Sequence, residues 1–350
     1  MNLLKELIFR KLSPGIFRLL LAVFVVIYHS TDFITIGHCA VYIFFILSGY
    51  WIYKMYNEKY SKFSSPYLVY IRSRCWRLLP LYWIVLAFSI SLYFLIPEIS
   101  NRVLPILSKN GAPEIMGSNL LLLGLANSVY LFIGSAWSLD IELQFYIIAP
   151  IFVIFINQKN AIYGTVLFAI LSIFAILYIK NVGIIVYLPW FMIGYLIYLY
   201  NYISTIKTAT YCLAIFGLIL TLHYVIPSIR DQYLLNRQAT FFIFNYREFL
   251  NVILALLTIP FITLNIRIPL ARHSKDQLYS SMSYVIYLIH WPLLQVYALT
   301  VIGLNKSQKL SHLIVYYVVC FAISWLISKY LDPLFENKRK LWLKKESLKR

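Results

Sequence analysis

The feature that most constrains this chain is a series of ten long apolar stretches. They lie at 16–36, 39–56, 78–97, 138–157, 161–179, 182–200, 209–227, 248–266, 283–303 and 312–332. A helix needs about 20 mostly apolar residues to cross a bilayer, and each stretch meets or approaches that length. Because 61% of the residues are apolar and 13% are charged, a water-soluble globule could not bury the apolar surface of this chain. The sequence therefore predicts an all-α fold, a polytopic membrane helix bundle of about ten transmembrane helices.

The distribution of Lys and Arg predicts the orientation of the bundle. With ten spans and a cytoplasmic N-terminus, 23 of the 31 Lys and Arg residues lie on the cytoplasmic side and 8 lie outside, as the positive-inside rule favours. The short apolar stretch 118–133 is an interfacial segment, a re-entrant segment or an eleventh span. An eleventh span would place the basic tail 333–350 outside, so we expect ten spans and cytoplasmic termini.

The net charge of +18 is then attributed to cytoplasmic loops and anionic lipid rather than to nucleic-acid binding. We expect residues 1–350 to form a single transmembrane domain that ends in the basic cytoplasmic tail. The four cysteines are Cys39, Cys75, Cys212 and Cys320. Because they are far apart and form no CxxC pair, neither a metal site nor a disulfide framework is expected.

Ionisable residues inside spans are costly in lipid and are candidates for function. In the segment FRLLLAVFVVIYHSTDF, His29 follows Arg18 by 11 residues, about 16 Å along a helix, which is beyond the middle of the bilayer. Asp32 follows His29 on the same helical face. A carboxylate beside an imidazole raises its basicity, which suits a general base. The alternative is a histidine that hydrogen-bonds between helices for packing.

A second cluster is YIRSRCWRLLPLYW, in which Arg74 and Arg77 share one helical face at the cytoplasmic end of a span. Two guanidinium forks at one helix entrance can bind phosphate groups. The alternative is ordinary positive-inside anchoring.

Two further segments place polar residues within spans. In WSLDIELQFYIIAP, Glu142 and Tyr146 are i,i+4 neighbours near the outer end of a span, where a carboxylate could bind a sugar hydroxyl or hold a catalytic group. The alternative, an acidic helix start, suits Asp140 better. In SYVIYLIHWPL, Pro292 is expected to bend or interrupt the helix, so that His290 lines a cavity.

Together and in this order, these segments resemble the acyltransferase 3 family of integral membrane acyltransferases, which includes bacterial O-antigen and exopolysaccharide O-acetyltransferases. The residues that match its motifs are Arg18, His29, Phe44, Phe45, Leu47, Ser48, Gly49, Arg74, Arg77, Pro80, Tyr82, Trp137, Ser138, Leu139, Glu142, Phe145, Tyr146, Ser283, Tyr284, Tyr287, Leu288, His290 and Pro292. Ala40, Tyr42 and Ser73 stand where the family pattern has Gly, Asp and Arg.

The resemblance implies transfer of an acyl group, usually acetyl, from cytoplasmic acyl-CoA to a hydroxyl of a cell-surface or lipid-linked carbohydrate at the bacterial inner membrane. It implies a catalytic role for His29 and coenzyme binding by Arg74 and Arg77. The expected partners are acyl-CoA, a carbohydrate acceptor and the lipid bilayer, with acetyl-CoA as donor and no metal.

Glu142 joins His29 as a candidate catalytic residue, and Asp32 joins it because of its place one turn after His29, since Asp32 is not part of the family pattern. Arg18 and His290 join the arginine pair at the donor site. Direct transfer and an acyl-histidine relay both stay open. The main alternative function is a transporter or flippase for a lipid-linked glycan, although no paired halves with broken helices are visible. An inactive relative that scaffolds polysaccharide synthesis is a third interpretation.

Overall fold

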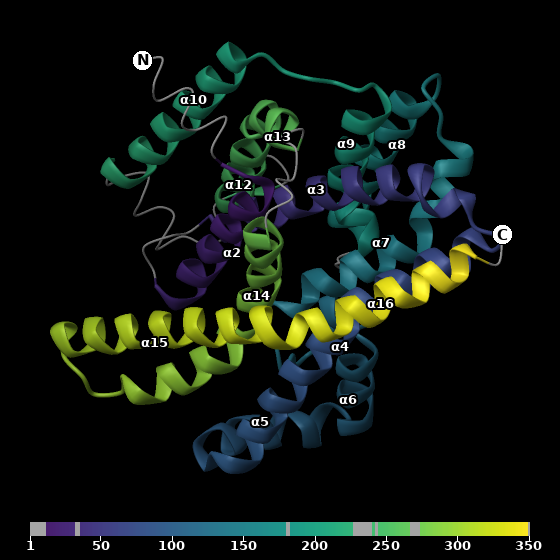
Figure 1. Ribbon diagram of the computed structural model, residues 1–350. Coiled ribbons are helices and arrows are strands. Elements are labelled where there is room, and N and C mark those ends of the chain that lie inside the picture. Colours follow the sequence, from purple (N-terminus) through teal and green to yellow (C-terminus); the bar gives the residue numbers. More distant parts are fainter. Residues whose placement is uncertain are drawn as a thin grey trace. The chain divides into compact units, whose positions relative to one another are not determined.

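The computed structural model describes residues 12–31, 36–179, 183–226, 240–241, 244–266 and 274–348, nearly all of them helical (Figure 1). The α-helices are α2 (Pro14–Ser30), α3 (Gly37–Glu58), α4 (Pro66–Leu95), α5 (Pro97–Asn110), α6 (Ala112–Leu121), α7 (Ala136–Phe155), α8 (Ala161–Phe174), α9 (Ile184–Leu199), α10 (Ile206–Val225), α12 (Tyr246–Leu257), α13 (Ile259–Asn265), α14 (Ser274–Thr300), α15 (Lys306–Leu326) and α16 (Asp332–Ser347). The prediction of an all-α fold is confirmed.

Shorter elements connect these helices. They are the 3-10 turns η1 (Tyr60–Lys62) and η2 (Leu125–Asn127), the π-helical turns η3 (Ala175–Ile179) and η4 (Ile327–Leu331), and the two-residue strands β1 (Thr240–Phe241) and β2 (Phe244–Asn245). The two strands pair antiparallel.

Each of the ten predicted apolar stretches is helical over most of its described residues. Within the described ranges, six helices are long and apolar enough to cross a membrane, or seven if the bent pair α12 and α13 is one span. Shorter apolar helices coincide with the other predicted stretches: Pro14–Ser30, Ala161–Leu177 and Ile184–Leu199. The chain is therefore a multi-pass membrane protein, while the count of ten spans and the cytoplasmic termini stay predictions.

The segment 118–133 does not form a helical span. Helix α6 ends at Leu121, after which Leu122 and Gly124 adopt left-handed conformations with φ of 53° and 77°. Only η2 is helical between there and the start of α7 at Ala136. An eleventh span at this place is thus excluded.

Asn119 explains why the chain can stay irregular here. Its buried side chain accepts a hydrogen bond from the Phe132 N–H (3.1 Å) and donates to the Tyr130 carbonyl (3.2 Å). The Tyr82 hydroxyl of α4 donates to the Asn119 carbonyl (2.6 Å). Since non-helical backbone at membrane depth needs partners from the protein, this amide takes the place of helical hydrogen bonds.

The chain folds as two compact units. Unit 1 comprises Met1–Trp51, Ile156–Lys180 and Ile185–Ser280. Unit 2 comprises Ile52–Phe155, Asn181–Ile184 and Ser281–Arg350. The boundaries fall inside α3 and α14, so both helices contribute to each unit.

Within unit 1, α3 and α9 approach each other at two glycines. A Cβ atom at Gly49 would collide with the backbone of Phe191, and one at Gly194 would collide with the backbone of Ile46. Small residues that let helix backbones come this close are the usual means of packing helices in lipid.

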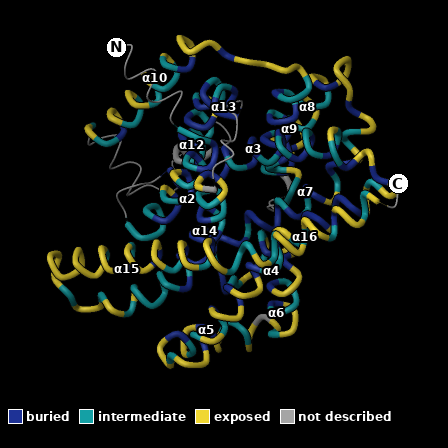
Figure 2. The backbone as a smooth tube through the Cα atoms, viewed as in Figure 1, coloured by how far each residue is buried: buried dark blue, intermediate teal, exposed yellow. Residues whose placement is uncertain are grey.

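Helix α10 of unit 1 exposes an apolar surface of the kind that contacts lipid. Only 11% of its most apolar window is buried within the protein, and Figure 2 shows exposed positions recurring along it. Large hydrophobic side chains are exposed along this helix: Ile206, Tyr211, Ile215, Leu218, Leu222 and Val225. Such a surface suits hydrocarbon as solvent.

We expect Asn119→Leu to lower the free energy of unfolding by at least about 2 kcal/mol, because each buried polar group left unpaired costs about 1–3 kcal/mol. The measurement is denaturant unfolding of the purified protein in detergent. Asn101→Leu on the exposed face of α5 is the matched control and should change stability by less than about 0.5 kcal/mol. Equal effects of the two changes would contradict the role given to Asn119.

Candidate functional site

Arg18 and His29 both lie on α2 in unit 1, as the sequence predicts. The Arg18 Nη1 atom donates to the Ser280 hydroxyl of α14 at 3.5 Å. The N-terminal end of α2 is fixed nearby, since the Gly15 N–H donates to the buried Asp276 carboxylate at 3.0 Å. Arg18 thus lies near the N-terminal end of α2, while His29 lies in the last turn of the helix.

His29 is half-buried, and its ring packs edge-on against the neighbouring Tyr28 with centroids 4.8 Å apart. Asp32, predicted to orient this imidazole, lies outside the described residues. The orientation of His29 by a carboxylate therefore stays a prediction.

A second imidazole lies close by in unit 1 and was missed by the sequence reasoning. His38 Nδ1 is 3.1 Å from Glu248 Oε2, and the Tyr42 hydroxyl donates to the same carboxylate. The Tyr42 ring stacks on Trp190 with centroids 4.5 Å apart. Tyr28 connects the two histidines, since its ring is 6.2 Å from that of His38.

One signal in the sequence could have pointed to this cluster. Tyr42 stands where the family pattern has Asp, so a carboxylate missing there could be supplied from elsewhere. The acidic residues between positions 160 and 280 are Asp231, Glu248 and Asp276. Only a structure could show that Glu248 is the one bonded to Tyr42, because 206 residues separate them.

In unit 2, Arg74 of α4 is buried within a cage of tyrosines. Its guanidinium carbon lies 5.7 Å, 5.8 Å and 5.9 Å from the ring centroids of Tyr60, Tyr70 and Tyr146. Its exposure is 9%, and its Nε atom has no hydrogen-bond partner among the described residues. The rings supply cation–π attraction, and the Nε–H donor, which has no partner among the described residues, is available for an anion.

Glu142 lies beside this cage. The Tyr146 hydroxyl donates to Glu142 Oε1 at 2.7 Å, which confirms the predicted i,i+4 contact on α7. The same Tyr146 ring faces Arg74. The expectation that Glu142 lies apart from the arginines, towards the other end of the bundle, is therefore wrong. The reason is that α4 begins at Pro66, so Arg74 lies about 12 Å inside the helix rather than at its entrance.

Arg77 completes this group on the exposed side of α4. Its charge and that of Glu142 both lie within electrostatic range of the Tyr284 hydroxyl on α14. The structure thus brings three predicted site residues together in unit 2: Arg74, Arg77 and Glu142.

Other motif residues of unit 2 join helices to one another. The Ser138 and Tyr287 hydroxyls are 2.6 Å apart, and the Ser135 hydroxyl donates to the Tyr287 carbonyl at 2.8 Å. The Tyr284 hydroxyl donates to the Leu78 carbonyl at 2.7 Å. These bonds fix α14 against α7 and α4, which positions Glu142 beside Arg74.

His290 is fully buried on α14, where its Nδ1 atom bonds to the Ile286 carbonyl at 3.0 Å. The Tyr316 hydroxyl donates to the His290 carbonyl at 3.1 Å. Of the two predicted effects of Pro292, a bend or an interruption, the interruption does not occur, because the helix is continuous from Ser274 to Thr300. Lone prolines are tolerated in membrane helices when neighbouring groups satisfy the freed carbonyl.

A cavity of about 270 Å³ lies along the same part of α14, in unit 2. Burial raises the pKa of the Tyr130 phenol in its wall, although Gln295 hydrogen-bonds to that phenol. The lining residues are Ile99, Arg102, Val103, Ile106, Tyr130, Trp291, Leu294, Gln295 and Ala298. Among the described residues, no three His, Cys, Asp or Glu side chains lie close enough together to hold a metal ion.

We expect Ser138→Ala and Tyr287→Phe to be energetically coupled. A double-mutant cycle on unfolding in detergent should give about 0.6–1.7 kcal/mol, the usual value for interhelical hydrogen bonds in membranes. The matched cycle pairs Tyr287→Phe with Ser91→Ala, whose exposed hydroxyl bonds only within α4 at 2.8 Å. That cycle should show no coupling. Additive effects at Ser138 and Tyr287 would show that their short contact contributes nothing.

Comparison with known proteins now places this geometry in a family. The family model described as an acyltransferase domain, acyltransferase 3, matches residues 13–329. Neither the curated proteins nor the solved structures give a match. Since the matched region is most of the chain, the protein belongs to the acyltransferase 3 family of membrane acyltransferases.

Proposed function

We propose that this protein is an O-acyltransferase of a bacterial cytoplasmic membrane. It moves an acyl group, in the simplest case acetyl, from cytoplasmic acyl-CoA to a hydroxyl of a cell-surface or lipid-linked carbohydrate. The observation that carries the proposal is the buried, tyrosine-caged Arg74 with Arg77 one turn further along α4.

This arrangement suits the donor because acyl-CoA carries phosphates. Guanidinium forks bind phosphate oxygens in a planar, bidentate manner. A cation with a buried, unpartnered Nε is already desolvated, so an anion that binds it gains more than it would at a surface. Glu142 lies near enough to orient the same site through Tyr146.

The transfer itself needs a base, since a sugar hydroxyl is a weak nucleophile at neutral pH. The His29 imidazole takes the hydroxyl proton as the oxygen attacks the thioester carbonyl. The C–S bond then breaks, and the coenzyme leaves as a thiol after protonation. In the relay variant, His29 attacks first, and the acyl group passes from its ring nitrogen to the hydroxyl. Both routes assign the proton or the acyl group to the same imidazole.

We expect His29→Ala to abolish transfer of label from radiolabelled acetyl-CoA to membrane glycan at normal protein abundance. General-base assistance is typically worth about 10²–10⁴-fold, and a relay would lose all transfer. His29→Gln should not restore transfer, because the amide cannot take a proton. His312→Ala on the exposed part of α15 is the neutral control.

His38→Ala is the decisive comparison, because His38 is already paired with the Glu248 carboxylate. Near-normal transfer by His29→Ala together with loss of transfer by His38→Ala would move the base to His38. A flippase would give no labelling of glycan with the wild-type protein.

We expect Arg77→Ala to raise the KM for acetyl-CoA by about tenfold or more, since a charge-assisted hydrogen bond contributes about 1.5–3 kcal/mol. Arg77→Lys should recover only part of the affinity, because it lacks the fork. Arg102→Ala, which removes an exposed arginine of α5, is the matched control for the loss of one positive charge. Unchanged KM in the Arg74→Ala/Arg77→Ala variant would remove the donor from this site.

A further inference from the structure

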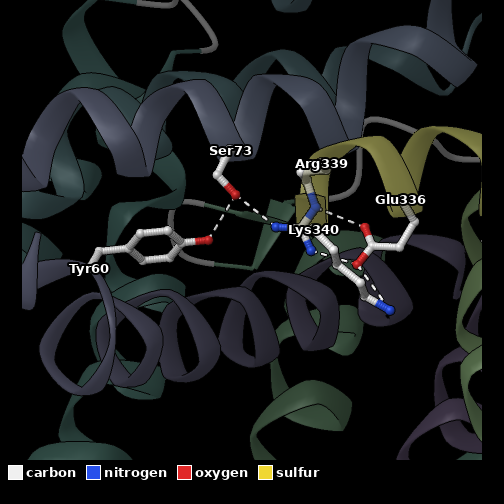
Figure 3. Close-up of polar contacts among 5 residues, drawn as sticks. All are labelled: Tyr60, Ser73, Glu336, Arg339 and Lys340. Atoms are coloured by element: carbon white, nitrogen blue, oxygen red, sulfur yellow. Dashed lines mark hydrogen bonds and ion pairs between the residues drawn. The ribbon is translucent and has the colours of Figure 1, made fainter. Parts of the chain in front are cut away.

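Helix α16 brings another arginine to the donor site of unit 2, from a region beyond the family match at 13–329. The Arg339 Nη1 atom donates to the Ser73 hydroxyl at 2.7 Å. Ser73 lies on α4 directly before Arg74 and is 1% exposed. Figure 3 shows the Arg339 guanidinium pointing at Ser73, with the Tyr60 hydroxyl on the other side of the serine at 2.9 Å.

Two contacts of the Trp342 ring also hold α16 against α4. The Trp342 ring packs on Trp76 with centroids 6.1 Å apart, and the Arg72 guanidinium lies 5.3 Å from the Trp342 ring centroid. Arg339 is therefore placed by a helix that is itself docked, and its side chain is only 11% exposed.

Glu336, one turn earlier on α16, sets the orientation of Arg339. Its carboxylate accepts from Arg339 Nε at 2.8 Å and from Nη2 at 2.6 Å, which is a bidentate pair. With the bond to Ser73 and a further interaction with the Tyr60 hydroxyl, up to four of the five N–H groups of the guanidinium are used. At least one donor therefore remains for a phosphate oxygen while Arg339 keeps these partners.

The surrounding charges show that Arg339 belongs with the arginines of α4. Arg74 and Arg339 both act electrostatically on the Tyr60 hydroxyl. Arg77 and Arg339 both act on the Glu336 carboxylate. Three guanidiniums from two helices thus lie within electrostatic range of shared groups, and both Glu142 and Glu336 are acidic residues near them.

The identity of the residue at position 73 explains why an arginine of α16 lies next to α4. Ser73 stands where the family pattern has an arginine, and the side chain that bonds to it is an arginine from 266 positions further along the chain. The serine side chain is smaller than an arginine side chain, and the Arg339 guanidinium lies against it. The positive charge absent from position 73 is present at the same place in the fold.

We propose that Arg339 is a third phosphate-binding residue of the acyl-CoA site, and that it supplies the guanidinium that position 73 lacks. The inference rests on the proposed function. It predicts that Arg339 binds the phosphate-bearing part of the donor and makes no contact with the acyl thioester.

An ordinary ion pair at a helix surface would explain the Arg339–Glu336 contact. It would not explain the burial of Arg339 or its hydrogen bond to Ser73. Exposed i,i+3 pairs contribute little and hold neither side chain in place. Arg339 is nearly buried and reaches across to α4, whereas the adjacent Lys340 has 55% exposure and lies 3.8 Å from Glu336. Lys340 is therefore the matched control, because it has the same charge and helix but no contact with Ser73.

The test compares two donors on membranes that hold each variant at equal abundance. Acetyl-CoA carries the phosphates, and S-acetyl-pantetheine has the same thioester without them. We expect Arg339→Gln to raise the KM for acetyl-CoA about tenfold or more and to leave the KM for S-acetyl-pantetheine within about twofold. Lys340→Gln should leave both values near those of the wild type.

A charge-relocation variant tests the geometry itself. Ser73→Arg/Arg339→Ser moves the guanidinium from α16 to α4 and should recover most of the acetyl-CoA affinity that Arg339→Gln loses. This variant decides the matter if Arg339→Gln alone proves unstable, since it keeps a guanidinium at the same site.

Three outcomes would overturn the proposal. One is an acetyl-CoA KM for Arg339→Gln equal to that of Lys340→Gln. Another is an equal loss with both donors, which would make Arg339 only structural. The third is a folded relocation variant with no recovered affinity. If the wild-type protein shows no use of either donor, the proposed function fails instead, and coenzyme A binding by the wild type separates the two cases.

Discussion

Hydrogen bonds made by buried polar side chains hold this structure together, because lipid removes the usual advantage of packing apolar faces. In hydrocarbon, a helix gains little by exchanging lipid tails for leucines, whereas an unpaired carbonyl or hydroxyl is costly. Helix α4 shows the consequence most clearly. It accepts a bond from Tyr284 at the Leu78 carbonyl, and it donates from Tyr82 to Asn119 and from Ser89 to Phe132.

The same constraint gives several motif residues a structural task. Ser138 and Tyr287 bond to each other, and Tyr284 bonds to α4. Each contact fixes a helix that carries a charged candidate, so the polar residues of one motif position the functional group of another. Glu142 reaches its place beside Arg74 because α7 is held at Ser138 and turned so that Tyr146 faces the arginine.

Local patterns in the sequence predicted what depends on local spacing. The apolar stretches became helices, Arg18 and His29 share α2, and Glu142 meets Tyr146 one turn away. The prediction failed where a contact joins distant segments. Glu248 lies 210 positions from His38, and hydrophobic periodicity carries no information about which polar residue another will meet. The irregular segment after α6 was ambiguous for a similar reason, since its stability depends on one amide, Asn119, and not on its own composition.

Burial separates two explanations for the arginines of α4 that the sequence left open. The positive-inside rule concerns cations that stay in water beside anionic lipid, and it describes Arg72, which is exposed and rests on Trp342. It does not describe Arg74, which is 9% exposed and enclosed by three tyrosine rings. Moving a cation out of water costs several kcal/mol, and each desolvated ring face offsets about 2 kcal/mol or more of this cost. The Nε atom of Arg74 has no hydrogen-bond partner among the described residues, which supports the proposal that an anion binds there. Arg77 acts electrostatically on the same Tyr146 hydroxyl as Arg74, and Arg339 acts on the same Tyr60 hydroxyl, which supports the proposal that this part of α4 binds phosphate.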